Sequence, residues 1–198
     1  MDAVDELVGQ LRGRTPAVRY RAAQKLGAPG VEAGRAVPTL ISLLEDRDGD
    51  VRHFAGVALR QIGEPAAKAV PGLLKELRSP VPGVRGRAAH TLRQLGPLAV
   101  KAVAGLTTAL ADDDPEVRRR AAWALAAVGS GTEKATAGLT ALLADPDPDL
   151  RWAAAHALGA IGPKAVKAGP ALTKLAADDG SDDVRQVAAE ALRKVRAG

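Results

Sequence analysis

Cysteine is absent from this chain of 198 residues, and aromatic residues make up only 2% of it. Without cysteine there is no disulfide framework and no thiolate chemistry. With so few aromatic residues, the core must consist of Ala, Leu and Val packed closely together, which suits helices lying against helices. Long hydrophobic runs are also missing, because charged residues or glycines interrupt each apolar stretch before it could span a bilayer.

Charge of one sign is not in large excess either. The net charge is +5, from 28 basic and 23 acidic residues, so the placement of the charges matters more than their sum. The N-terminal segment, Met-Asp-Ala-Val-Asp-Glu, is acidic, whereas a secretory signal begins with positive charge and continues into an apolar stretch. We therefore expect a cytoplasmic protein that has no membrane association.

What the sequence does contain is a dipeptide of an aliphatic residue and arginine that recurs at a fixed interval. It occurs at residues 18–19, 51–52, 84–85, 117–118, 150–151 and 184–185, which are 33 residues apart except for the last step of 34. A period in this range indicates a solenoid, in which each unit buries its apolar face against its neighbours. The period predicts a single domain over residues 1–198, with repeats at about 1–30, 31–63, 64–96, 97–129, 130–162 and 163–198.

Residues 97–129 show how one repeat is built. A first helix ends at an acidic turn, and Asp114-Pro115 then starts a second helix as its N-cap and first helical residue. The buried stripe of the second helix follows from helical periodicity and consists of Val117, Ala121, Leu125 and Val128. A glycine in the left-handed conformation ends the helix, and this stop recurs as Gly30, Gly63, Gly96, Gly129 and Gly162. Applied to all repeats, the pattern predicts helices at 3–12, 16–27, 35–46, 49–61, 68–78, 82–95, 101–111, 115–128, 134–144, 148–161, 167–177 and 182–196.

Three features of these repeats match a known family. Val-Pro pairs open first helices, the second helices read Val-Arg-x-x-Ala-Ala/Gly-x-x-Leu, and first helices close with an aspartate, at Asp46, Asp112, Asp145 and Asp178. In these respects the chain resembles HEAT-repeat proteins of the HEAT-like class named after phycobilisome lyases. The resemblance implies an all-α right-handed α-solenoid of six two-helix repeats whose second helices line the concave surface. It also implies that the arginine of each repeated dipeptide bridges neighbouring repeats through the aspartates.

The concave face gathers the large side chains. Counted from the first residue of each repeated dipeptide as position zero, all aromatic residues and histidines occupy positions 2, 3 or 6 of second helices. Together with basic residues on the same face, they form the predicted ligand-binding set: Tyr20, Arg21, His53, Phe54, Arg87, His90, Arg119, Arg120, Trp123, Trp152 and His156. The carboxylate at an equivalent position is Glu190. Aromatic residues on one exposed face mark a binding surface, and a basic groove attracts an acidic partner. The alternative is that bulky residues fill space left by an Ala-Leu core and that the arginines serve solubility.

These observations favour a non-enzymatic, monomeric interaction scaffold that binds an acidic protein or peptide segment on the concave face. Nucleic-acid binding by the same arginines, with bases stacked on the aromatic rings, is the alternative. The two hypotheses differ in salt dependence, because phosphate binding weakens steeply as ionic strength rises.

An enzyme of bilin-lyase or glycosylase type is the third hypothesis, and the residues support it least. Deoxyhypusine hydroxylase, a HEAT-like enzyme, binds iron through His-Glu pairs, whereas Phe54, Thr91 and Ala157 follow the three histidines here. The HEAT-like alkyl-base glycosylases pair tryptophans with an acidic residue, and no carboxylate is expected beside Trp123 and Trp152. We therefore predict no catalytic residues, no metal and no cofactor.

Overall fold

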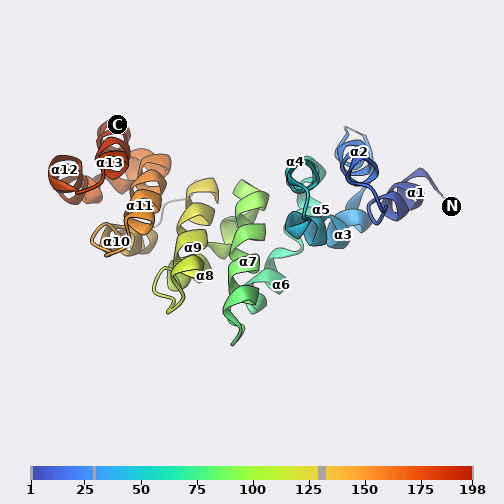
Figure 1. Ribbon diagram of the computed structural model, residues 1–198, viewed down its shortest axis with the longest axis horizontal. Coiled ribbons are helices and arrows are strands. Elements are labelled where there is room, and N and C mark those ends of the chain that lie inside the picture. The colour runs from blue at the N-terminus through green and yellow to red at the C-terminus, as the bar shows by residue number, and fades with distance from the viewer. Residues whose placement is uncertain (1, 29, 129–132, 198) are drawn as a thin grey trace. The chain divides into compact units, whose positions relative to one another are not determined.

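The computed structural model describes residues 2–28, 30–128 and 133–197, and all regular structure within these ranges is helical (Figure 1). The chain forms two compact units, Met1–Gly72 and Leu73–Gly198. Within the first unit the helices are α1 (Ala3–Gln10), α2 (Pro16–Leu26), α3 (Val37–Ser42), α4 (Gly49–Ile62) and α5 (Glu64–Ala67). Helix α1 packs against α2, α3 packs against α4, and the two second helices α2 and α4 lie against each other. Helix α6 (Val70–Glu76) crosses the boundary of the two units.

The second unit contains the helices α7 (Pro82–Leu95), α8 (Val103–Ala109), α9 (Pro115–Val128), α10 (Glu133–Leu142), α11 (Pro148–Ile161), α12 (Gly169–Asp178) and α13 (Asp182–Arg196). The second helices α7, α9, α11 and α13 pack against one another in that order (Figure 1). The first helices α8, α10 and α12 each pack against the second helix that follows them. The predicted α-solenoid of two-helix repeats is confirmed.

Most of the predicted helices are found within a few residues of their expected ends. The main differences lie in the first helices, which begin with tight 3-10 turns over residues 96–102 and 162–168. Each turn has proline as its second residue and a kink at Ala99 or Ala165, so regular α-helix starts only at residue 103 or 169. The third repeat also contains the short helix α5, which the periodic pattern did not indicate.

Two local signals account for the boundaries of the second helices. Asp48, Asp114 and Asp147 act as N-caps, since each side chain accepts hydrogen bonds of 2.9–3.1 Å from backbone N–H groups of the first turn. At the other end, Gly63 and Gly162 have φ of 72° and 69° with ψ of −129° and −140°. The prediction of a left-handed helical stop is therefore wrong in detail, because only φ is positive while ψ is extended. That combination is almost restricted to glycine. Gly129 lies outside the described residues.

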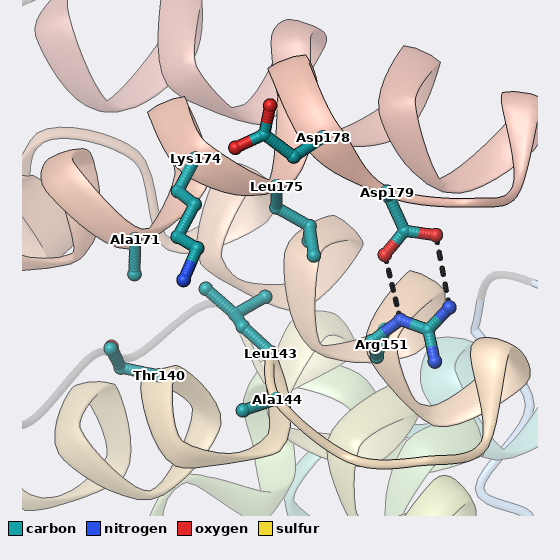
Figure 2. Close-up of a pocket in the computed structure, with 9 residues that line it drawn as sticks. All are labelled: Thr140, Leu143, Ala144, Arg151, Ala171, Lys174, Leu175, Asp178 and Asp179. Atoms are coloured by element: carbon teal, nitrogen blue, oxygen red, sulfur yellow. Dashed lines mark hydrogen bonds and ion pairs between the residues drawn. The ribbon is translucent and has the colours of Figure 1, made fainter.

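Arginine–aspartate pairs connect successive repeats within each unit. Arg19 pairs with Asp46, Arg85 with Asp112 and Arg151 with Asp179, each through two hydrogen bonds of 2.7–2.9 Å. The same guanidinium groups donate to backbone carbonyls of the loop before their own helix, for example from Arg151 to Asp145 and Pro146. Figure 2 shows the Arg151–Asp179 pair at the edge of a cavity of about 290 Å³. The predicted bridging role is confirmed for these three arginines. Arg52 instead donates to the backbone carbonyls of Asp46 and Arg47, and Arg185 pairs with Asp182 of its own helix.

The aspartate of the last pair differs from the one predicted. Asp178 is exposed and points away from Arg151, whereas Asp179 accepts two hydrogen bonds from the Arg151 guanidinium (Figure 2). The sixth repeat carries one extra residue, which moves the equivalent position from 178 to 179. The pair between Arg118 and Asp145 is looser than the others, with an N–O distance of 3.6 Å.

Candidate ligand-binding surface

Three rings from two neighbouring second helices form a cluster in the second unit. Trp123 of α9 lies 5.0 Å from Trp152 of α11, measured between ring centroids. His156, one turn after Trp152, stacks on it at 5.1 Å with the ring planes only 8° apart, and lies 5.0 Å from Trp123. The cluster forms because position 6 of one repeat faces positions 2 and 6 of the next. All three rings are half-buried, since each covers part of the others.

Cations border this ring cluster on two sides. The Arg93 guanidinium of α7 lies 5.1 Å from the Trp123 ring centroid, within the range of a cation–π contact. On the other side, the Lys194 side chain of α13 lies against Gly159 of α11. Its Cδ is 3.6 Å from the position that a Cβ atom would occupy at this glycine. Burial of the His156 imidazole lowers its pKa, and the charges of Lys194 and Arg93 lower it further. Both effects favour the neutral form of His156.

Two of the arginines predicted as ligand contacts are held by carboxylates. Arg119 donates to Glu116 on its own helix and lies 3.4 Å from Asp149 on α11. Arg120 donates to Glu116 at 2.7 Å. Glu190 is still the carboxylate at the counted positions, but the expectation that no carboxylate lies beside Trp123 and Trp152 is wrong. Glu116 and Asp149 reach this face from the position just before the repeated dipeptide, and Asp149 lines a hollow with both tryptophans. The i,i+3 and i,i+4 spacing from Glu116 to the two arginines is the signal that could have revealed them.

A smaller ring cluster lies in the first unit. Tyr20 of α2 stacks on Phe54 of α4 with centroids 5.6 Å apart, and His53 meets the edge of Phe54 at 5.3 Å. Arg21 lies 6.0 Å from the Tyr20 ring, at the outer limit of a cation–π contact. All four residues were predicted as ligand contacts. Two of them lie on α2 and two on α4, so neighbouring repeats bring ring side chains together here as they do in the second unit.

The remaining two predicted residues lie on α7. Arg87 is exposed and His90 is half-buried. We use the name second-helix face for the surface of α7, α9, α11 and α13 that carries Arg87, Arg93, the ring cluster, Arg193 and Lys194.

Across residues 2–28, 30–128 and 133–197, no group of three or more His, Asp or Glu side chains could hold a metal ion. Nor is any helix in those ranges both long and apolar enough to cross a membrane.

The comparison with protein families gives one match that extends over most of the chain. HEAT repeats match residues 4–93, 70–144 and 103–193. Among curated protein sequences, none matches the chain.

Several solved structures share the fold. An engineered protein is 27% identical over 100% of this chain and 98% of its own, with a TM-score of 0.58. A chain in the complex of CpcE and CpcF of phycocyanin lyase from Nostoc sp. PCC7120 is 27% identical over 79% of this chain and 98% of its own length, with a TM-score of 0.60. A designed armadillo repeat protein in complex with the peptide (KR)4 has a TM-score of 0.61 over 98% of this chain and 100% of that one. At 22% identity it shows similarity of fold alone.

Proposed function

Because the chain belongs to the HEAT-repeat family, we propose that it is a non-enzymatic interaction scaffold that binds an acidic protein or peptide segment on its second-helix face. Repeat solenoids of this type commonly serve as scaffolds for protein interactions. Their function depends on the side chains that a particular array presents, so the proposal rests on the composition of this face.

The observation that carries the proposal is the ring cluster with its bordering cations. Two indoles and an imidazole supply a large, rigid contact area, and tryptophan is enriched among residues that dominate binding energies. Arg87, Arg93, Arg193 and Lys194 are exposed, and among the described residues none of them pairs with a carboxylate. Carboxylates of a partner can satisfy these cations through charge-assisted hydrogen bonds.

Nucleic-acid binding is the second candidate, favoured by the near-parallel Trp152 and His156 rings on which bases could stack. The pairing of Arg119 and Arg120 with Glu116 and Asp149 counts against it, because these two arginines are then not available to the phosphates next to bases stacked on the rings. A lyase-type activity is the alternative that the similarity to CpcE and CpcF supports. It predicts that adding the chain to phycocyanin changes the absorbance of the bound pigment.

Fluorescence anisotropy of labelled octaglutamate and of a labelled single-stranded oligonucleotide of eight nucleotides tests the two binding candidates. We expect octaglutamate to bind more tightly than the oligonucleotide, and the double variant Arg93→Gln/Lys194→Gln to weaken its binding at least tenfold. The matched control, Lys174→Gln/Arg196→Gln, removes two exposed cations that are not part of the second-helix face. Tighter binding of the oligonucleotide, with a steep loss of affinity as salt rises, would favour the second candidate instead.

A further inference from the structure

We propose that the partner segment is an extended peptide with one aromatic or large aliphatic side chain, separated by two or three residues from a group of carboxylates. This inference rests on the proposed function and specifies the chemistry of its ligand. It follows from two neighbouring parts of the second-helix face that differ in charge.

The first part is a hollow between α9 and α11. Its volume is about 250 Å³, and Arg119, Trp123, Asp149 and Trp152 line it. This is smaller than the volume of about 300–1,000 Å³ that sites for drug-sized ligands occupy, so it fits a single side chain. Two of the four lining residues are tryptophans, so their indoles supply the apolar surface of the hollow.

The charges around this hollow largely cancel. Arg119 is held by Glu116 and Asp149, and Arg120 is also held by Glu116, so two guanidinium groups face two carboxylates. A carboxylate or phosphate gains little from entering such a neutral site, whereas an aromatic or aliphatic side chain gains apolar contact with the indoles. The paired Arg119 and Asp149 can still hydrogen-bond the backbone of a bound peptide.

The second part is the cationic flank, which borders the ring cluster on two sides and consists of Arg93 in the last turn of α7 and of Arg193 and Lys194 in the last turn of α13. All three side chains are exposed, and Arg93 also covers the Trp123 ring. No ion pair of these three residues is found within the described part of the chain. Acidic side chains of the ligand are therefore directed here rather than into the hollow.

The spacing of the two parts sets the spacing of the ligand groups. The Arg93 guanidinium lies 5.1 Å from the ring centroid of Trp123, which lines the hollow. The Lys194 side chain lies against Gly159, seven residues after Trp152 and therefore roughly 10 Å from it along α11 at a rise of about 1.5 Å per residue. An extended chain advances about 3.3 Å per residue, so two or three residues connect the apolar side chain to the carboxylates.

Isothermal titration calorimetry with four peptides tests the inference. The first two place Phe and three Glu residues at the ends of a Gly-Gly spacer, in the two possible orders. The third replaces Phe by Ala, and the fourth replaces the three Glu residues by Lys. We expect the better of the two Phe peptides to bind at least tenfold more tightly than the Ala peptide, and the Lys peptide to show no binding.

Variants separate this inference from the proposed function. Trp152→Ala should remove the advantage of Phe over Ala and leave binding of the Ala peptide unchanged, whereas Trp152→Phe should retain most of the advantage because it keeps a ring against Trp123. Equal binding of the Phe and Ala peptides by the wild-type chain would overturn the inference and leave the scaffold proposal standing. If none of the Glu peptides binds, both proposals fail. Preferential binding of the Lys peptide would overturn the charge assignment.

Discussion

Arg151 donates two hydrogen bonds, of 2.7 and 2.9 Å, to Asp179 and none to the adjacent Asp178. The Asp179 side chain is only 4% exposed, so this pair lies between α11 and the end of α12 in a site that water barely reaches. Similar pairs of Arg19 with Asp46 and of Arg85 with Asp112 join other repeats. Repeat arrays depend on such contacts between neighbours, so the pairs contribute directly to the stability of each unit.

Replacing Asp179 by Asn should therefore destabilise the protein by about 2 kcal/mol, because it leaves the Arg151 guanidinium without its charged acceptor. Asp178→Asn is the matched control, since the neighbouring side chain is exposed and its loss should cost less than about 0.5 kcal/mol. Urea unfolding followed by circular dichroism gives both values. Equal effects of the two substitutions would contradict the assignment of the pair.

The same pairs predict how stability depends on pH. Hydrogen bonds from the arginines lower the pKa of Asp46, Asp112 and Asp179. As pH falls below about 4, the unfolded chain binds protons before the folded one does. The stabilisation is thus complete above that pH and is lost as pH falls through the lowered pKa values. Unfolding free energies at pH 7 and pH 3 should differ less for Asp112→Asn than for the wild type. An identical difference would show that the Arg85–Asp112 pair does not contribute.

His156 should titrate below the usual range for histidine. Burial is the main cause of its lowered pKa, followed by the charges of Lys194 and Arg93, while Glu190 acts in the opposite direction. The contribution to stability is present above the unfolded pKa of about 6.5 and is lost as pH falls through the folded value. Histidine NMR signals give the pKa directly. Lys194→Gln should raise it, whereas Arg196→Gln should not, and an unchanged pKa in Lys194→Gln would place the lysine too far away.

The contact between Trp123 and Trp152 should be visible as an energetic coupling. In a double-mutant cycle with Trp123→Ala and Trp152→Ala, we expect a coupling free energy of about 1 kcal/mol, because the rings lie 5.0 Å apart and are half-buried. Urea unfolding of the two single variants and the double variant measures it. Strict additivity would indicate that the two indoles are independent in solution.

Gly162 and Gly169 differ in backbone conformation, although neither has another group within 4 Å of the position that a Cβ would occupy. Gly162 has φ of 69° and ψ of −140°, so alanine should cost about 2 kcal/mol there. Gly169 has φ of −50° and ψ of −48°, where alanine fits and should be neutral or slightly stabilising. Melting temperatures of the two alanine variants test this contrast, and similar values would show that the chain relaxes at residue 162.

The repeat period predicted the fold because it reflects local chemistry that recurs in each unit. Asp48, Asp114 and Asp147 cap second helices as expected, and the stripe of Val117, Ala121, Leu125 and Val128 is buried. The strict period predicted the wrong acceptor for Arg151 in the sixth repeat, where the spacing changes from 33 to 34 residues. The extra residue in the sixth repeat made Asp178 look equivalent to an acceptor that is in fact Asp179.

The candidate surface was predictable in part. Helical positions placed Trp123, Trp152 and His156 on one face, but whether the rings contact one another depends on how α9 packs against α11. Assigning the arginines by helix face alone overlooked the i,i+3 and i,i+4 spacing that pairs Glu116 with Arg119 and Arg120. The contact of Arg119 with Asp149 depends on how α9 packs against α11, which the positions do not give. A basic face inferred from sequence was thus divided by packing into a neutral hollow and a cationic flank.

The most direct test of the account is tryptophan emission during titration with the peptide that carries Phe and three Glu residues. Both tryptophans of the chain belong to the ring cluster, so a ligand on the second-helix face must change their environment. We predict a saturable change in emission for the wild type and for Lys174→Gln/Arg196→Gln, and a much weaker response for Arg93→Gln/Lys194→Gln. Binding detected by calorimetry without any change in emission would place the ligand elsewhere and contradict the account.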